Sequence, residues 1–184
     1  MRGFVVYHTH LRVCIPDFPE GKMKIGDNIS IDIFGPLNNS HVKVGRIENT
    51  NNRIAATFLT LRGHVERGFI TFSIDQNKNG DLTFQIEGVS QANYGTGFLL
   101  GLTGSSPREK QSQSWLEVLG NFANVTGNDS GKVNVNFTSS KEGKVFNSGD
   151  NVDRSSSFSG NLGDINTKEK RKNVASELQK DLDE

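Results

Sequence analysis

The chain has 184 residues, which suits one domain or one domain with an appendage. Lys plus Arg and Asp plus Glu each number 21, so no net charge draws the chain to nucleic acid or an anionic membrane. No run approaches the roughly 18 apolar residues that cross a bilayer, and Met1-Arg2-Gly3 does not begin a signal peptide. We therefore expect a soluble protein without a nucleic-acid partner or a membrane span.

Strand-like alternation begins with Ile29, Ile31 and Ile33, which occupy every second position and so give a strand one apolar face. Similar patterns predict further strands, and Asn79-Gly80 has the chemistry of a hairpin turn. Because the connections are short, we expect antiparallel pairing. The predicted strands cover residues 28–33, 41–44, 53–61, 68–74 and 82–86.

A helix is predicted over residues 107–125. Ser106 can cap it, Pro107 suits its first position, and Glu109 completes a capping box. Its apolar stripe consists of Trp115, Leu119 and Phe122, widened by Leu116, Val118 and Val125. Such a helix needs an apolar surface to cover, so we expect an α+β fold in which it packs on the curved antiparallel sheet.

The composition changes after Gly127 toward Ser, Asn, Gly, Asp and Lys. We therefore expect a domain over residues 1–127 and a polar, largely flexible tail over residues 128–184. Two ordered elements stay open as alternatives in the tail. They are an edge strand at residues 133–137 and a short C-terminal helix carrying Val174, Leu178 and Leu182.

Catalytic motifs of the common kinds are absent. The sequence has no phosphate loop, HExxH pair, GxSxG elbow or CxxC motif. The single cysteine, Cys14, excludes an internal disulfide and is interpreted as a small buried hydrophobe. We expect no cofactor. His8 and His10 have the spacing of two metal ligands on a strand, but a polar strand face is the favoured interpretation.

The segment from Gly63 to Gly68 holds the best candidate for chemistry. His64 and Glu66 are two residues apart in a connection between strands and would suit an acid/base pair. The structural alternative is that the glycines permit a turn in which His64 bonds the loop backbone. Arg62 and Arg67 are candidates for binding an anionic ligand, or a solvated rim of the loop.

Residues 26–125 resemble the helix-grip or START-like superfamily, also called SRPBCC. The resemblance is carried by the Ile29 strand, the stretch 63–72, the 82–86 strand and the helix around Trp115. The stretch from Gly63 is similar to bacterial members that have a Gly-His-x-Glu-x-Gly turn before a strand. The first 24 residues are short for the family's early helices. In this family an antiparallel sheet curls around a long helix and leaves an apolar ligand cavity.

The resemblance implies a module that binds a small apolar or amphipathic ligand. The residues that would line its site are Phe72, Phe84, Trp115, Leu119 and Phe122. The chain also resembles, more weakly, the C-terminal domains of Rhs-type polymorphic toxins, in which a similar β domain is followed by a polar tail, as residues 128–184 would be here. That likeness implies an effector delivered by a type VI or similar secretion system, with an immunity protein or delivery shell as partner. A structural or interaction domain is the third alternative.

Overall fold

The computed structural model of the chain describes residues 13–14, 23–32, 39–64, 66–92, 107–126, 131–139 and 154–183. The chain divides into two units, residues 1–102 (unit 1) and residues 103–184 (unit 2). Within the described ranges, neither helix has the length and apolar character needed to cross a membrane.

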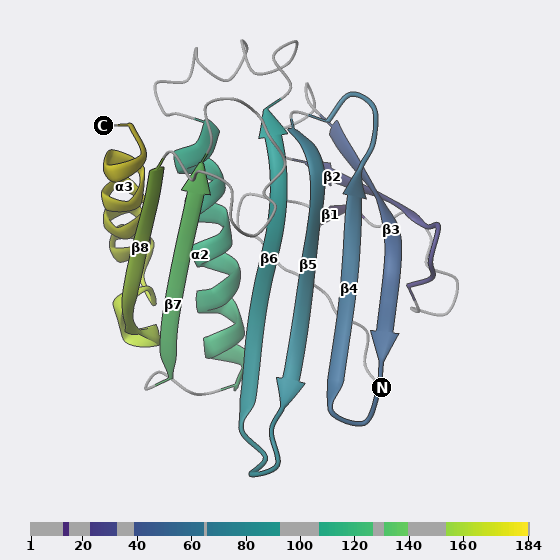
Figure 1. Cartoon of the computed structure of the whole chain (residues 1–184), viewed down its shortest axis with the longest axis horizontal. Coiled ribbons are helices and arrows are strands. Elements are labelled where there is room, and N and C mark those ends of the chain that lie inside the picture. The colour runs from purple at the N-terminus through teal and green to yellow at the C-terminus, as the bar shows by residue number, and fades with distance from the viewer. Residues whose placement is uncertain are drawn as a thin grey trace. The chain divides into compact units, whose positions relative to one another are not determined.

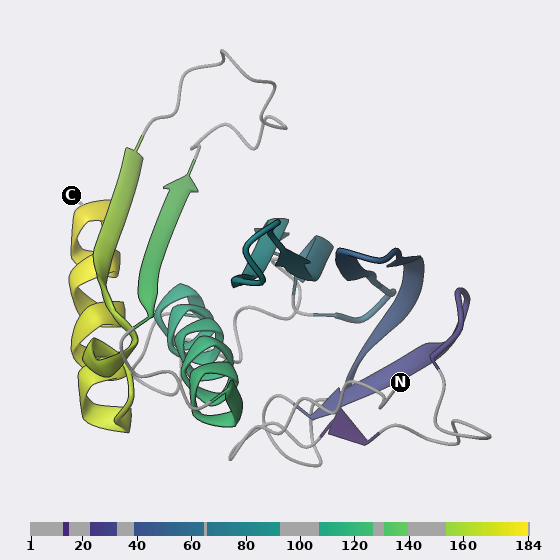
Figure 2. The ribbon, with the colours of Figure 1, turned by 90° about the horizontal axis from the view of Figure 1, so that it is seen from below.

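Unit 1 contains one antiparallel sheet in which each strand pairs with the next along the chain. The strands are β1 (Val13–Cys14), β2 (Asn28–Asp32), β3 (Asn39–Asn49), β4 (Arg53–Thr60), β5 (Glu66–Gln76) and β6 (Leu82–Ala92). Figure 1 shows β3 to β6 side by side, and Figure 2 shows the sheet curving between β6 and β2. The predicted antiparallel sheet and the α+β class are confirmed.

The strands' alternation gives this sheet two unlike faces. Residues that are partners across strands share a face: Val44 lies opposite Phe58, which lies opposite Ile70. We call this side the apolar face. Its apolar residues on β2 to β6 include Ile29, Val42, Val44, Ile47, Ile54, Ala56, Phe58, Ile70, Phe72, Ile74, Phe84 and Ile86. The other side, the opposite face, is mainly polar.

The turn between β5 and β6 explains the register of this hairpin. The Asn77 Oδ1 atom accepts hydrogen bonds from the backbone N–H groups of Asn79 (2.8 Å) and Asp81 (3.0 Å). Gly80 has a φ of +90°, a conformation that glycine adopts without the strain of a side chain. The predicted Asn79-Gly80 hairpin is confirmed.

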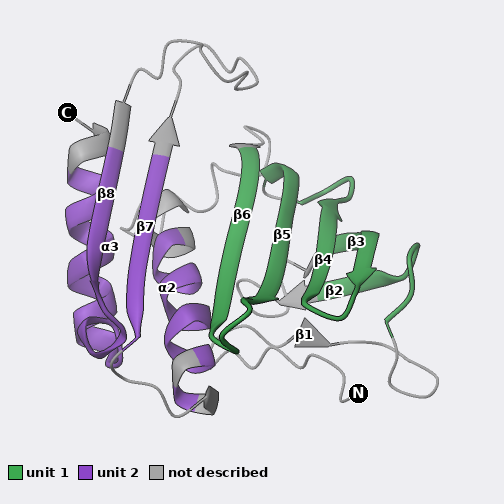
Figure 3. Cartoon of the chain, turned by 60° about the horizontal axis from the view of Figure 1, so that its bottom comes forward, with its two compact units in different colours: residues 1–102 green, residues 103–184 purple. Residues whose placement is uncertain are grey.

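Unit 2 is coloured separately in Figure 3. Its elements are α2 (Pro107–Thr126), β7 (Lys132–Ser139), β8 (Arg154–Asn161), the 3₁₀ turn η2 (Leu162–Asp164) and α3 (Lys168–Asp183). The helix predicted over residues 107–125 matches α2. The strands β7 and β8 form an antiparallel hairpin, and α2 and α3 pack against each other.

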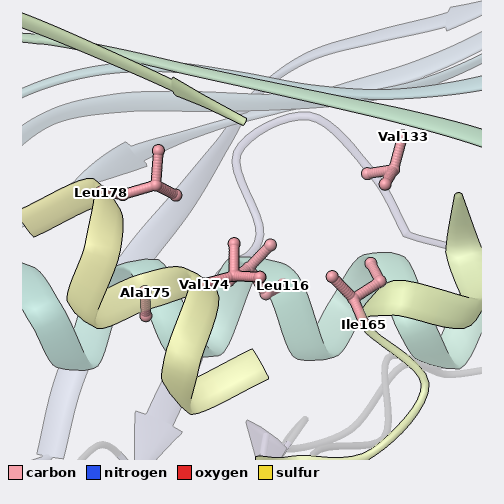
Figure 4. Packing of buried hydrophobic residues seen from close by; sticks show 6 residues of the cluster. All are labelled: Leu116, Val133, Ile165, Val174, Ala175 and Leu178. Carbon is pink, nitrogen blue, oxygen red and sulfur yellow. The ribbon is translucent and has the colours of Figure 1, made fainter. Parts of the chain in front are cut away.

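The buried core of unit 2 consists of one apolar residue each from α2, β7 and the segment after η2, and three from α3. Val133 of β7, Leu116 of α2 and Ile165 after η2 meet the buried face of α3 (Figure 4). That face consists of Val174, Ala175 and Leu178. Partly buried apolar residues then surround this cluster: Leu119, Val135, Phe137, Phe158 and Leu162. Unit 2 therefore has a hydrophobic core of its own.

This core corrects the prediction of a largely flexible tail after Gly127. Both ordered alternatives are present, since β7 covers the proposed edge strand and α3 the proposed C-terminal helix. The strand β8 lies within the segment that was expected to be flexible. The physical reason is that the few apolar residues of the tail gather with Leu116 of α2, so α2 belongs to the same unit as the tail.

Gly120 sets how closely α2 approaches the segment that follows β8. A Cβ atom at this position would lie 3.1 Å from the Ile165 carbonyl oxygen and 3.3 Å from Arg171 Nη1. Arg171 Nη1 in turn donates a hydrogen bond of 2.9 Å to the same carbonyl. The missing side chain at Gly120 thus leaves room for the Ile165 carbonyl group, whose oxygen accepts a hydrogen bond from Arg171 of α3.

Candidate functional site

The connection between β4 and β5 forms the turn that the sequence singled out. The His64 N–H group donates to the Leu61 carbonyl oxygen at 3.1 Å, and the Leu61 N–H group donates to the His41 carbonyl oxygen at 2.9 Å. Gly63 has a φ of +93°, a left-handed conformation that residues with a Cβ atom rarely adopt. The turn is therefore held by its own backbone and by β3.

The imidazole of His64 takes part in this turn. Its Nδ1 atom accepts a hydrogen bond of 3.0 Å from the Glu66 backbone N–H group. Burial lowers the pKa of His64 below 6.5, and the nearby His41 acts in the same direction. At neutral pH the ring is therefore neutral, and with Nδ1 accepting, the tautomer carries its proton on Nε2.

Gly68 lies just after the turn, near the start of β5, and packs closely against β4 and β6. The Thr60 Oγ1 atom accepts a hydrogen bond from the Gly68 N–H group at 2.8 Å and donates to the Gly68 carbonyl oxygen at 3.2 Å. A Cβ atom on Gly68 would lie 1.9 Å from the Val89 carbonyl oxygen. The second glycine of the Gly-His-x-Glu-x-Gly pattern is thus required by close packing against β6.

These contacts bear on the proposed acid/base pair of His64 and Glu66. A neutral imidazole has one nitrogen with a free electron pair, and in His64 that nitrogen accepts the Glu66 amide. To act as a general base, His64 would first have to release this bond. The bond that the structural alternative requires is present, while the catalytic role stays a prediction.

The predicted ligand residues of the sheet, Phe72 and Phe84, both lie on the apolar face. Phe72 packs edge to face with Phe58, with a distance of 5.8 Å between ring centroids and an interplanar angle of 73°. Phe84 lies opposite Ile74. All three aromatic residues are only partly buried. The face therefore has apolar surface beyond its small buried cluster of Ile29, Val42 and Val44.

The predicted ligand residues of α2 divide into two groups. Leu119 packs against the core of unit 2, next to Leu116. Trp115 and Phe122 are half-buried and, with Val118, form a second stripe at i, i+3 and i+7 outside that cluster. Leu119 thus contributes to the core of unit 2, and the ligand role predicted for all three residues stays a prediction.

The predicted anion-binding residues Arg62 and Arg67 are both exposed. Arg62 lies beside the turn, and Arg67 lies at the start of β5. No group of three or more His, Cys, Asp or Glu side chains in the described ranges is placed to hold a metal ion. The structure does not describe His8 and His10, nor the side chain of Cys14.

Sequence reasoning did not find a chain of ion pairs on the opposite face. Arg53 donates to the Asp75 carboxylate at 2.5 Å, and its Nε atom lies 3.6 Å from Glu48, which also pairs with Arg46 at 3.3 Å. The bond to Asp75 raises the pKa of the Arg53 guanidinium above its usual value. Strand register unites these residues, and register cannot be read from one strand at a time.

A comparison with protein families matches residues 5–104 to a family described as "Domain of unknown function (DUF1990)". The match includes β1 to β6 with the Gly63–Gly68 turn, and it ends before α2. Comparisons with curated proteins and with solved structures found no match.

Proposed function

The chain belongs to the DUF1990 family, and from that premise we propose that it is a ligand-binding module of helix-grip type. Its ligand would be small and apolar or amphipathic, and it would lie on the apolar face of the sheet. Phe72 and Phe84 are the contacts that we assign to it on that face. The family match covers the whole of this sheet.

The observation that carries the proposal is the incomplete burial of the apolar face. On β4, β5 and β6, eight apolar side chains of this face are partly exposed to solvent. They are Ile54, Ala56, Phe58, Ile70, Phe72, Ile74, Phe84 and Ile86. Leaving this much adjoining apolar surface in contact with water is unfavourable, so an apolar molecule that covers it would be stabilised.

The minimum size of such a ligand follows from the free energy gained for each Å² of apolar surface removed from water. A dissociation constant of 1 μM corresponds to about 8.2 kcal/mol. At about 25 cal/mol for each Å² of apolar surface removed from water, this requires about 330 Å² before the costs of association are counted. A molecule with a long alkyl chain or a fused ring system satisfies this requirement, whereas a small polar metabolite does not.

The test is a titration of the full chain with an environment-sensitive naphthalene sulfonate dye, followed by displacement with fatty acids and with sterols. We expect saturable binding that Phe72→Ala weakens at least about tenfold. Phe69→Ala is the matched control, because Phe69 lies three residues earlier on β5 but on the opposite face. Circular dichroism establishes that both variants fold, and Phe84→Leu is a milder second change. Absence of saturable binding, or equal effects of both Phe→Ala variants, would contradict the proposal.

An enzymatic effector domain is the second candidate function. The observation in its favour is that His64, in the neutral form that acid/base chemistry requires, lies beside Glu66 in one turn. Expression of the chain in bacterial cells tests it, since an effector would arrest growth and His64→Gln would relieve the arrest. Normal growth with the wild-type chain would count against this candidate.

A further inference from the structure

The opposite face of the sheet has a row of exposed apolar side chains. Leu59 lies opposite Phe69, and Phe69 lies opposite Val89, so the three residues are neighbours across β4, β5 and β6. Their exposed fractions are 43%, 44% and 38%. Isolated exposed apolar residues are ordinary, but a contiguous row on an otherwise polar face is typical of an interaction surface.

Charged residues lie at the two ends of this surface. On β3, Lys43 lies opposite Leu59 and extends the row. The next row on the same face runs from Arg46 on β3 through Thr57 and Thr71 to Glu87 on β6. In these two rows the residues on β3 are basic and Glu87 on β6 is acidic, while Glu48, which pairs with Arg46, lies on β3 beyond them. Lys43 and Glu87 are exposed and form no ion pair within the described ranges.

We propose that this surface binds a second copy of the chain, face to face. The two copies are related by a twofold axis that lies midway between the two sheets. The axis is parallel to the strands and passes over the gap between β4 and β5. Such an axis reverses the order of the strands, so that β3 of one copy lies over β6 of the other. In the apolar row, Leu59 then lies over the partner's Phe69. In the next row, Arg46 lies over the partner's Glu87. The same contacts form twice because the interface is symmetric.

This arrangement agrees with how sheets pack. Two sheets stack about 10 Å apart with strand directions within about 30° of each other, which keeps equivalent rows in contact. Four strands about 4.8 Å apart, with about six residues each at about 3.4 Å, give a flat footprint of about 19 by 20 Å. That is small beside the roughly 800 Å² per partner of a standard interface. The dimer should therefore be weak and dissociate on dilution.

Sedimentation velocity of the full chain across a range of concentrations tests the proposal. We expect a reversible monomer–dimer equilibrium whose dissociation constant Phe69→Ser raises at least about tenfold. Leu82→Ser is the control, because Leu82 is more exposed, at 54%, but lies on β6 outside the row. A chain that is monomeric at all concentrations, that forms larger open assemblies, or whose dimer persists in Phe69→Ser overturns the proposal.

A charge exchange tests the orientation of the two copies. Glu87→Arg places like charges over the partner's Arg46 and should weaken the dimer. Combining it with Arg46→Glu restores opposite charges and should recover the wild-type affinity. The exchange also removes the exposed pair of Arg46 with Glu48, so circular dichroism is compared for each variant. If the double variant is no tighter than Glu87→Arg alone, the twofold arrangement is incorrect.

Discussion

The hydrogen bond between His64 and Glu66 makes the stability of the chain depend on pH in a defined direction. Burial lowers the pKa of His64 in the folded chain below the 6.5 of an exposed histidine. Between the folded and the unfolded pKa, the unfolded state binds more protons, so acid favours unfolding. The contribution of His64 is therefore complete above pH 6.5 and is lost as the pH falls through the folded pKa.

The bond from the Glu66 N–H group to Nδ1 sets the size of the effect, because protonation of Nδ1 removes its acceptor. A hydrogen bond of this kind contributes on the order of 1 kcal/mol. For a unit of about 100 residues, this corresponds to a shift of about 4–8 °C in the melting temperature. His64→Ala should therefore melt several degrees below wild type at pH 7.5.

Thermal unfolding of wild type and His64→Ala at pH 7.5, 6.5 and 5.5, followed by circular dichroism, measures this difference. The difference in melting temperature between the two chains should shrink as the pH falls. Protonation of His64 breaks, in the wild type, the hydrogen bond that the variant already lacks. Arg62→Gln, which changes an exposed residue beside the same turn, is the control. A gap that stays constant, or that widens in acid, would refute the reasoning.

Three further substitutions test the packing. Gly63→Ala should cost about 1–2 kcal/mol in urea unfolding, because its φ of +93° is unfavourable for alanine although no atom lies within 4 Å of the new Cβ atom. Gly68→Ala should cost far more and give little folded protein on expression, since its Cβ atom would lie 1.9 Å from the Val89 carbonyl oxygen. Leu116→Ala should destabilise unit 2 by about 2–5 kcal/mol in calorimetry, because Leu116 is fully buried in its core.

Local patterns were sufficient to predict strands β2 to β6 of unit 1 and the helix α2, although not the two-residue strand β1. The isoleucines of β2 alternate, Asn79-Gly80 takes its positive φ within one short loop, and Pro107 begins the helix. Each of these signals lies within a few neighbouring residues and is read from the chain without knowledge of distant contacts. The predicted bounds of these elements consequently agree with the structure, apart from strands that extend further.

The core of unit 2 was missed because it is not a local feature. Val133, Ile165 and Leu178 are separated by polar stretches, and no window around one of them has the apolar content of a core. Average composition therefore predicted a flexible tail. The row of Leu59, Phe69 and Val89 was missed for a related reason, since it exists only once the register of three strands is known.

Two adjacent residues of α2 test which face of this helix belongs to the core of unit 2. Leu116 belongs to the core of unit 2, whereas Trp115 lies on the second stripe and is only half-buried. The sequence alone would assign Trp115→Ala the roughly 3–5 kcal/mol of a fully buried aromatic residue. The structure predicts a smaller loss of stability than for Leu116→Ala. Urea unfolding of the two variants measures this difference. A loss of stability in Trp115→Ala as large as that in Leu116→Ala would contradict the placement of Trp115 outside the core of unit 2.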